Sequence, residues 1–128
     1  MRIYLDSGVA ITAAQTRISS SGLYVIDTLC ENYNVCFPRE VKVEVVDNGL
    51  VGGYPDAVRL NAKVNAGQIT VERAPAVHSK YERIIRGYTG LGSGDIAILK
   101  VALQNRRNKR QVVSLSDDHL VLLIAHRL

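Results

Sequence analysis

The stretch IYLDSGVAITAA, residues 3–14, decides the fold class. Ile3, Tyr4 and Leu5 favour a β-strand, and the small and apolar residues that follow Asp6 indicate a closely packed helix. A buried strand that leads directly into a helix is the repeating unit of an α/β protein with a parallel sheet. Asp6, the first acid of the chain, falls at the junction of the two elements.

The rest of the chain alternates between the same two kinds of segment. This alternation predicts an α/β layer fold with a mainly parallel central sheet flanked by helices, in a single domain over residues 1–128. A final apolar segment, residues 120–128, is expected to be a helix that needs cover on more than one side. Further strands are expected at 33–37, 68–72 and 111–115, and helices at 23–31, 55–65, 77–86 and 95–105.

Residues 38–47 are ambiguous on pattern alone. The alternation and the valines of residues 41–46 slightly favour a strand. Pro38 in a first helical turn, followed by the acid Glu40, favours a helix instead. Both interpretations remain open on periodicity.

Composition narrows the class of protein. The chain has 128 residues, of which 47% are hydrophobic, and this is enough for one domain with a sizeable core. It contains no apolar run that would span a bilayer and no secretory signal pattern, so the expected location is the cytoplasm. Cys30 and Cys36 have neither redox nor zinc spacing and are expected to be reduced thiols, with a local disulfide as the alternative. The net charge of +4 favours polyanionic partners.

Acids stand where strands or loops meet helices: Asp6, Asp95, and the adjacent pair Asp117 and Asp118. In open α/β sheets ligands bind beyond the carboxyl ends of the strands, so these acids could share one crevice. Each could instead cap a helix, although only one of the adjacent pair can be that cap. Crowded carboxylates repel one another and raise each other's pKa, and a site that keeps them usually binds a cation.

Four segments taken together resemble the PIN domain, a nuclease fold that includes VapC-like toxins. The segments are IYLDSG at 3–8, PREVKVE at 38–44, GDIAIL at 94–99 and VSLSDD at 113–118. Their order and rough spacing agree with the family over nearly the whole chain. The resemblance implies a three-layer fold with a mainly parallel sheet, and it implies that residues 38–47 form a helix.

The resemblance also implies which residues form the site. The fourth acid of the family commonly follows a hydroxyl residue by two positions, so Ser116 points to Asp118, with Asp117 as a neighbour that substitutes or contributes. Ser7 and Ser116 are expected to position the acids through hydrogen bonds. The expected catalytic residues are Asp6, Glu44, Asp95, Asp117 and Asp118, and all of these except Glu44 are expected metal ligands.

Two features depart from the family pattern. Many relatives have Glu where Asp95 stands, and the shorter Asp side chain is expected to shift the position of the metal. Relatives usually add a further strand after the last acid, so the single domain at 1–128 is expected to lack the usual final strand.

The expected activity follows from this set of acids. Mg²⁺ or Mn²⁺ prefers carboxylate oxygens, and such a metal promotes attack of water on a phosphodiester. The resemblance therefore implies a metal-dependent endoribonuclease, the toxin of a toxin–antitoxin pair, assembled as a homodimer. The alternative is a catalytically silent PIN-like module that binds RNA or protein. Four cations follow the helix predicted at 95–105: Arg106, Arg107, Lys109 and Arg110. They are candidate RNA contacts, or they simply complement the dipole of that helix.

Overall fold

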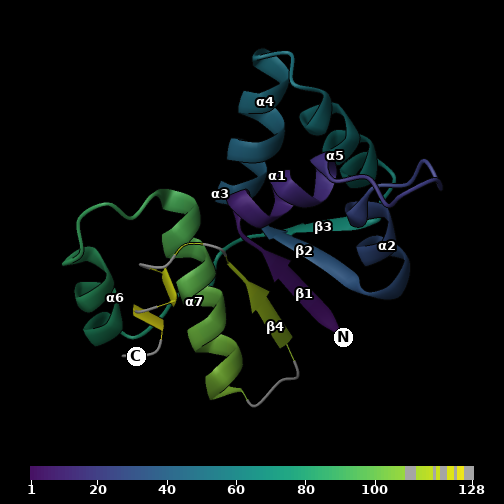
Figure 1. Ribbon diagram of the computed structural model, residues 1–128. Helices are drawn as coiled ribbons and strands as arrows, with labels where there is room; N and C mark the ends of the chain where they lie inside the picture. The colour runs from purple at the N-terminus through teal and green to yellow at the C-terminus, as the bar shows by residue number, and fades with distance from the viewer. Residues whose placement is uncertain (109–111, 117, 119–120, 123, 126–128) are drawn as a thin grey trace.

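The computed structural model describes residues 1–108, 112–116, 118, 121–122 and 124–125 (Figure 1). In this part of the chain four strands form one sheet in the order β3-β2-β1-β4, and all neighbouring strands are parallel. The predicted α/β fold with a mainly parallel sheet is confirmed. The strands are β1 (Arg2–Leu5), β2 (Asn34–Pro38), β3 (Ile69–Glu72) and β4 (Val112–Leu115).

The helices follow the predicted order and begin or end within a few residues of the predicted bounds. Three short pieces between β2 and α5 form one continuous helical stretch, in which the middle piece, η1, is a π-helix. The elements are α1 (Ser7–Gln15), α2 (Val25–Asn32), α3 (Arg39–Lys42), η1 (Val43–Asp47), α4 (Asn48–Val51), α5 (Pro55–Asn65), α6 (Ser79–Arg86) and α7 (Ser93–Arg107).

Periodicity slightly favoured a strand at residues 41–46, and this prediction is wrong because the segment is helical. Val41, Val45 and Val46 are buried, whereas Val43 is 41% exposed. Spacings of four and five residues between buried side chains describe one face of a helix, not one face of a strand. Valine's preference for strands is weak enough for tertiary packing to override it.

The sheet lies between two layers of helices (Figure 1). The chain moves across the sheet in one direction from β1 through β2 to β3, and then returns past β1 to β4. Because crossovers between parallel strands are almost always right-handed, opposite directions of travel place the connecting helices on opposite faces. Accordingly α2 and α5 pack on β2 and β3, while α7 packs on β4 and β2 from the other side. The expected three-layer arrangement is confirmed.

The core lies between the sheet and these helices. Strand residues such as Leu5, Val35 and Phe37 are almost fully buried, as is Leu99 in α7. In the helix predicted at 95–105, Ala97, Ile98, Leu99 and Val101 are buried. Among the described residues no helix is long and apolar enough to cross a membrane. Cys30 and Cys36 are both free thiols, as expected.

The apolar segment at 120–128 lies partly outside the described residues. Of its described members, Val121 and Ile124 are buried in the chain's own core, at 2% and 1% exposure, and Leu122 is 49% exposed. At these two positions, the apolar side chains are therefore covered by other residues of the same chain.

Candidate acidic site

The sheet has its topological switch point between β1 and β4. The chain leaves β1 toward β2 on one side and enters β4 from the opposite face. In open α/β sheets ligands commonly bind beyond the carboxyl ends of two such strands. Asp6 directly follows β1, and its N–H donates to the Leu115 carbonyl at the end of β4 with an N···O distance of 3.0 Å. Helix α7 runs back against the strands, so its N-terminus lies at the same edge (Figure 1).

Asp6 is the most buried acid of the described chain, with 3% of its surface exposed. Its Oδ1 accepts a hydrogen bond of 2.8 Å from the N–H of Val9 and so caps α1. Its position is therefore fixed twice, by pairing of the backbone with β4 and by the side-chain cap.

Glu44 lies in the π-helical turn η1, and its carboxylate connects η1 with the first turns of α1 and α7. The Ser7 hydroxyl, at the start of α1, donates to Glu44 Oε2. The Gly94 N–H, in the first turn of α7, donates to Glu44 Oε1 at 3.2 Å, and the Ser93 hydroxyl lies 3.4 Å from the same oxygen. Single π-helical turns are frequent at functional sites, because the wider turn redirects the side chains that it carries.

Asp95 lies in the first turn of α7, and its Oδ2 accepts from the Gly92 N–H at 3.1 Å. Burial raises the pKa of Asp95 above its usual value, and the carboxylates of Asp118, Glu44 and Asp6 raise it further against the lowering effect of the Gly92 N–H. A carboxylate senses other acids in this way only when they are close. The structure thus brings Asp6, Glu44, Asp95 and Asp118 into one electrostatic neighbourhood.

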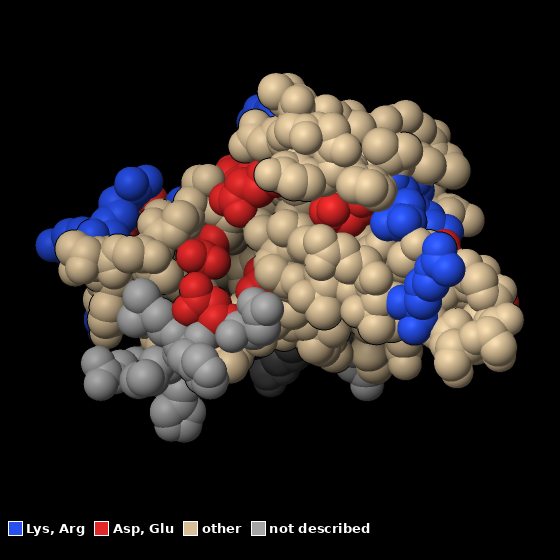
Figure 2. Space-filling view, turned by 45° about the horizontal axis from the view of Figure 1, so that its top comes forward, with Lys and Arg blue, Asp and Glu red and all other residues tan. Residues whose placement is uncertain are grey.

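Figure 2 shows acidic side chains gathered around a hollow on one face of the molecule. Asp118 lies three residues after the end of β4. Its N–H donates to the Ser116 hydroxyl oxygen at 3.1 Å, and its Oδ1 accepts from the Val121 N–H at 3.3 Å. Ser116 was expected to position the acids through a hydrogen bond, and this bond to the backbone of Asp118 is such a contact. Asp117, the other member of the predicted pair, lies outside the described residues.

Capping and site formation turn out to be compatible for these aspartates. Asp6, Asp95 and Asp118 each use one carboxylate oxygen to accept a backbone N–H at a helix start or in its approach. These bonds account for one oxygen of each carboxylate and fix its direction. The capping interpretation therefore explains how the acids are held, while their convergence from separate segments needs a further reason.

The donor chemistry of this neighbourhood suits a hard divalent cation, since all four side chains are carboxylates. Within the described residues, however, no three His, Cys, Asp or Glu side chains are arranged so that they could hold a metal ion. Mg²⁺ commonly binds through one or two carboxylates and keeps several waters, which requires fewer converging side chains.

The residues that hold Glu44 at α7 were not singled out from the sequence. The glycine-rich stretch 90–94 is typical of a loop and does not by itself indicate a contact with Glu44. In the structure Gly94 is buried, and a Cβ there would lie 3.0 Å from Glu44 Oε1 and 3.2 Å from Oε2. The available signal was a glycine one position before Asp95, where only the smallest residue allows such a close approach.

The predicted RNA contacts are only partly described. Arg106 and Arg107 end α7 and are exposed, at the opposite end of that helix from Asp95. Lys109 and Arg110 lie outside the described residues. The two arginines therefore do not belong to the acidic neighbourhood.

Comparison with models of known protein families, with curated proteins and with solved structures gave no match for this chain.

Proposed function

We propose that this chain is a metal-dependent endoribonuclease of the PIN type. The observation that carries the proposal is that Glu44 accepts hydrogen bonds from Ser7 and from Gly94, the residues next in sequence to Asp6 and Asp95. The acids of this neighbourhood come from four separate segments and meet at the switch point of a parallel sheet, the usual position of ligand sites in this fold class. Like charges are rarely gathered in this way unless a ligand or a reaction uses them.

The proposed chemistry is hydrolysis of a phosphodiester. A bound Mg²⁺ or Mn²⁺ would stabilise the charge that develops on the phosphate. One or two carboxylates among Asp6, Asp95 and Asp118, with Asp117 as a further candidate, would hold the ion together with several waters. Ser7 and Gly94 fix the direction of the Glu44 carboxylate. Water attacks the phosphorus, a carboxylate accepts a proton from that water, and the P–O bond to the leaving oxygen breaks as this oxygen takes a proton from solvent.

RNA is the proposed substrate, and a protein antitoxin in the cytoplasm is the proposed regulator. The net charge of +4 and the exposed cations at the end of α7 support a polyanionic substrate. A homodimer is also proposed. It is supported by exposed apolar side chains in and around α4 and α5, chiefly Val51 at 91%, Tyr54 at 60% and Val58 at 57% exposure.

A silent PIN-like module that binds RNA or protein is the second candidate. It is favoured by one observation, namely that no three acidic, His or Cys side chains in the described residues are placed to hold an ion. Such a module would keep the fold and the binding surfaces but would cleave no RNA in any divalent metal.

The deciding experiment measures cleavage of single-stranded RNA by purified wild type and Asp6→Asn, with and without Mn²⁺. Asn retains a side-chain oxygen that can cap α1, so the variant is expected to fold with a similar melting temperature. Cleavage is expected to fall at least about 100-fold, since even the loss of an outer hydrogen-bond partner of a metal ligand typically costs about 10–100-fold.

Asp47→Asn is the matched control. Asp47 pairs with Lys42 on the partly exposed side of the same helical stretch, and its loss should leave cleavage near the wild-type rate. If wild type shows no cleavage that depends on Mn²⁺ or Mg²⁺, the silent module is correct. If Asp6→Asn cleaves as fast as wild type, the assigned site is wrong.

A further inference from the structure

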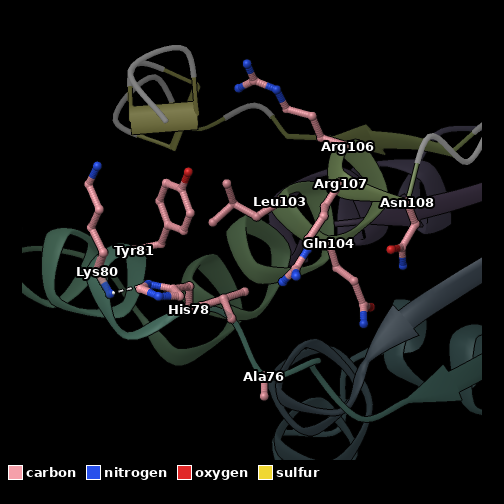
Figure 3. A pocket seen from close by; sticks show the side chains of 10 residues that line it. Ala76, His78, Lys80, Tyr81, Leu103, Gln104, Arg106, Arg107 and Asn108 are labelled. Carbon is pink, nitrogen blue, oxygen red and sulfur yellow. Dashed lines mark hydrogen bonds between the residues drawn. The ribbon is translucent and has the colours of Figure 1, made fainter.

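A second site of different chemistry lies at the other end of α7. An open pocket of about 800 Å³ is bounded by the segment before α6, by the first turn of α6 and by the last turns of α7 (Figure 3). Its lining includes the cations Lys80, Arg106 and Arg107, the rings of His78 and Tyr81, and the amide of Gln104.

The charge of this pocket is unbalanced. Among the described residues, no Asp or Glu lines it. The carboxylate of Glu82, on the same helix α6, is already paired with Arg86 at 2.9 Å and with Lys100 at 3.1 Å. In the part of the chain that the structure describes, none of the three pocket cations has an ion pair with a carboxylate. A concave site with cations on both walls attracts a polyanion.

The rings of the pocket are held in an edge-to-face arrangement. The His78 and Tyr81 ring centres are 6.5 Å apart and the ring planes meet at 78°. The Nδ1 of His78 accepts a hydrogen bond of 3.2 Å from the Lys80 N–H (Figure 3), so the neutral ring carries its proton on Nε2 as a donor. Aromatic faces beside cations are what single-stranded nucleic acids use, since bases stack on the rings while phosphates meet the charges.

We propose that this pocket binds single-stranded RNA, with phosphates on Lys80, Arg106 and Arg107 and a base against Tyr81 or His78. The choice of RNA among polyanions rests on the function proposed above. The combination of stacking rings and a side-chain amide favours a nucleic acid over an acidic peptide, which would use the cations alone. Figure 3 shows Arg106 and Arg107 leaving α7 in different directions, so the two charges are separate.

The position of the pocket defines what it adds to the acidic site. Asp95 and Arg107 are 12 residues apart on one helix, which corresponds to about 18 Å along its axis. A strand that reaches both places spans several nucleotides. The pocket therefore acts as an anchor that favours longer substrates, without taking part in bond cleavage.

The test is the binding of a fluorescent single-stranded RNA of about ten nucleotides, a length within the usual site sizes of such proteins. Binding is measured by anisotropy in EDTA, where no metal-dependent cleavage occurs. Arg107→Gln is expected to weaken binding several-fold and to lower the slope of log K against log salt by about 1. Tyr81→Leu is expected to weaken binding at least about fivefold with an unchanged slope.

Arg83→Gln is the matched control, because Arg83 is an exposed cation on α6 that does not line the pocket. It should bind RNA like wild type. Equal losses in Arg83→Gln and Arg107→Gln, wild-type binding by both pocket variants, or tighter binding of a poly-glutamate peptide than of RNA would each overturn the proposal. If the variants change RNA binding as expected but the wild-type protein never cleaves RNA, the proposed nuclease activity is wrong and the RNA-binding pocket is still supported.

Discussion

The Gly94 N–H donates a hydrogen bond to Glu44 Oε1, 50 residues earlier in the sequence, at 3.2 Å. This bond ties the first turn of α7 to the π-helical turn η1. It also explains why position 94 is glycine, since a Cβ there would stand 3.0 Å from Oε1. A side chain at position 94 would therefore require the Glu44 carboxylate to shift.

Gly94→Ala is expected to displace the Glu44 carboxylate and to reduce RNA cleavage by about tenfold or more, the usual scale for a disturbed site contact. The effect on stability should be small, because Ala favours a helical position over Gly by about 1 kcal/mol and this gain offsets the crowding. Cleavage rate and melting temperature are measured together. Gly92→Ala is the control, since its Cβ would meet only ordinary contacts, 3.7 Å from Asp95 and 3.9 Å from Glu44.

The two serines that face Glu44 should differ in importance. Ser7 donates to Oε2 in a partly buried setting, whereas the Ser93 hydroxyl is exposed and lies 3.4 Å from Oε1. Ser7→Ala is expected to lower the free energy of unfolding by about 1 kcal/mol and Ser93→Ala by less than about half of that. Urea unfolding of the two variants measures the difference. Equal losses would mean that Ser7 does not hold Glu44 in solution.

The proposed homodimer can be tested at its most exposed apolar residue. Val51 is 91% exposed at the end of α4, so Val51→Asp should leave the folded monomer as stable as wild type to within about 0.5 kcal/mol. A carboxylate buried at an interface lacks a partner, so the same change should shift a dimer to monomer in light scattering. A wild-type chain that is monomeric at every concentration rules out the dimer.

Much of the fold could be predicted because the signal for each of the strands β1, β2 and β4 lies in a short stretch of local sequence. Residues 3–5 and the apolar runs before Pro38 and Ser116 are short, rich in β-favouring side chains and bounded by breaks, and they became β1, β2 and β4. Residues 41–46 misled on periodicity, since a valine-rich helix with a π turn buries side chains at a spacing that alternation does not describe.

The acids could be named from sequence because strand ends and helix starts are local features. Their coupling could not, since it depends on α7 running back to the carboxyl edge and on Glu44 reaching across to Gly94. Only some of the residues that line the basic pocket could be identified from the sequence. Arg106 and Arg107 stood out as a charge run, but Lys80 and Tyr81 join them through the packing of α6 beside α7.

The stability of the protein is expected to depend on pH through Asp95. Burial first, and then the carboxylates of Asp118, Glu44 and Asp6, hold the pKa of Asp95 above its ordinary value near 3.8. The folded state therefore keeps this proton at pH values where the unfolded chain has released it. The stabilising contribution of the group is complete below the unfolded pKa and is lost as pH rises through the folded pKa.

Asp95→Asn removes this titration while keeping an oxygen that can accept from the Gly92 N–H. In metal-free buffer the variant should melt higher than wild type at neutral pH, and the difference should shrink as pH falls toward the unfolded pKa. A lost helix-dipole interaction, typically about 0.3–1 kcal/mol, opposes the gain. Melting curves from pH 3 to 8 without metal, with the pH range chosen about the reference pKa of roughly 3.9, measure the balance.

Mn²⁺ should reverse the order of the two proteins. A ligand that binds only the folded state stabilises it by mass action, by about 2.7 kcal/mol at 100 times its dissociation constant. Wild type should therefore gain far more from Mn²⁺ than Asp95→Asn, while Asp47→Asn should gain as much as wild type. If Asp95→Asn melts lower than wild type without metal and gains an equal increment from Mn²⁺, then Asp95 serves only to cap α7. The metal would then have to be held by the other acids.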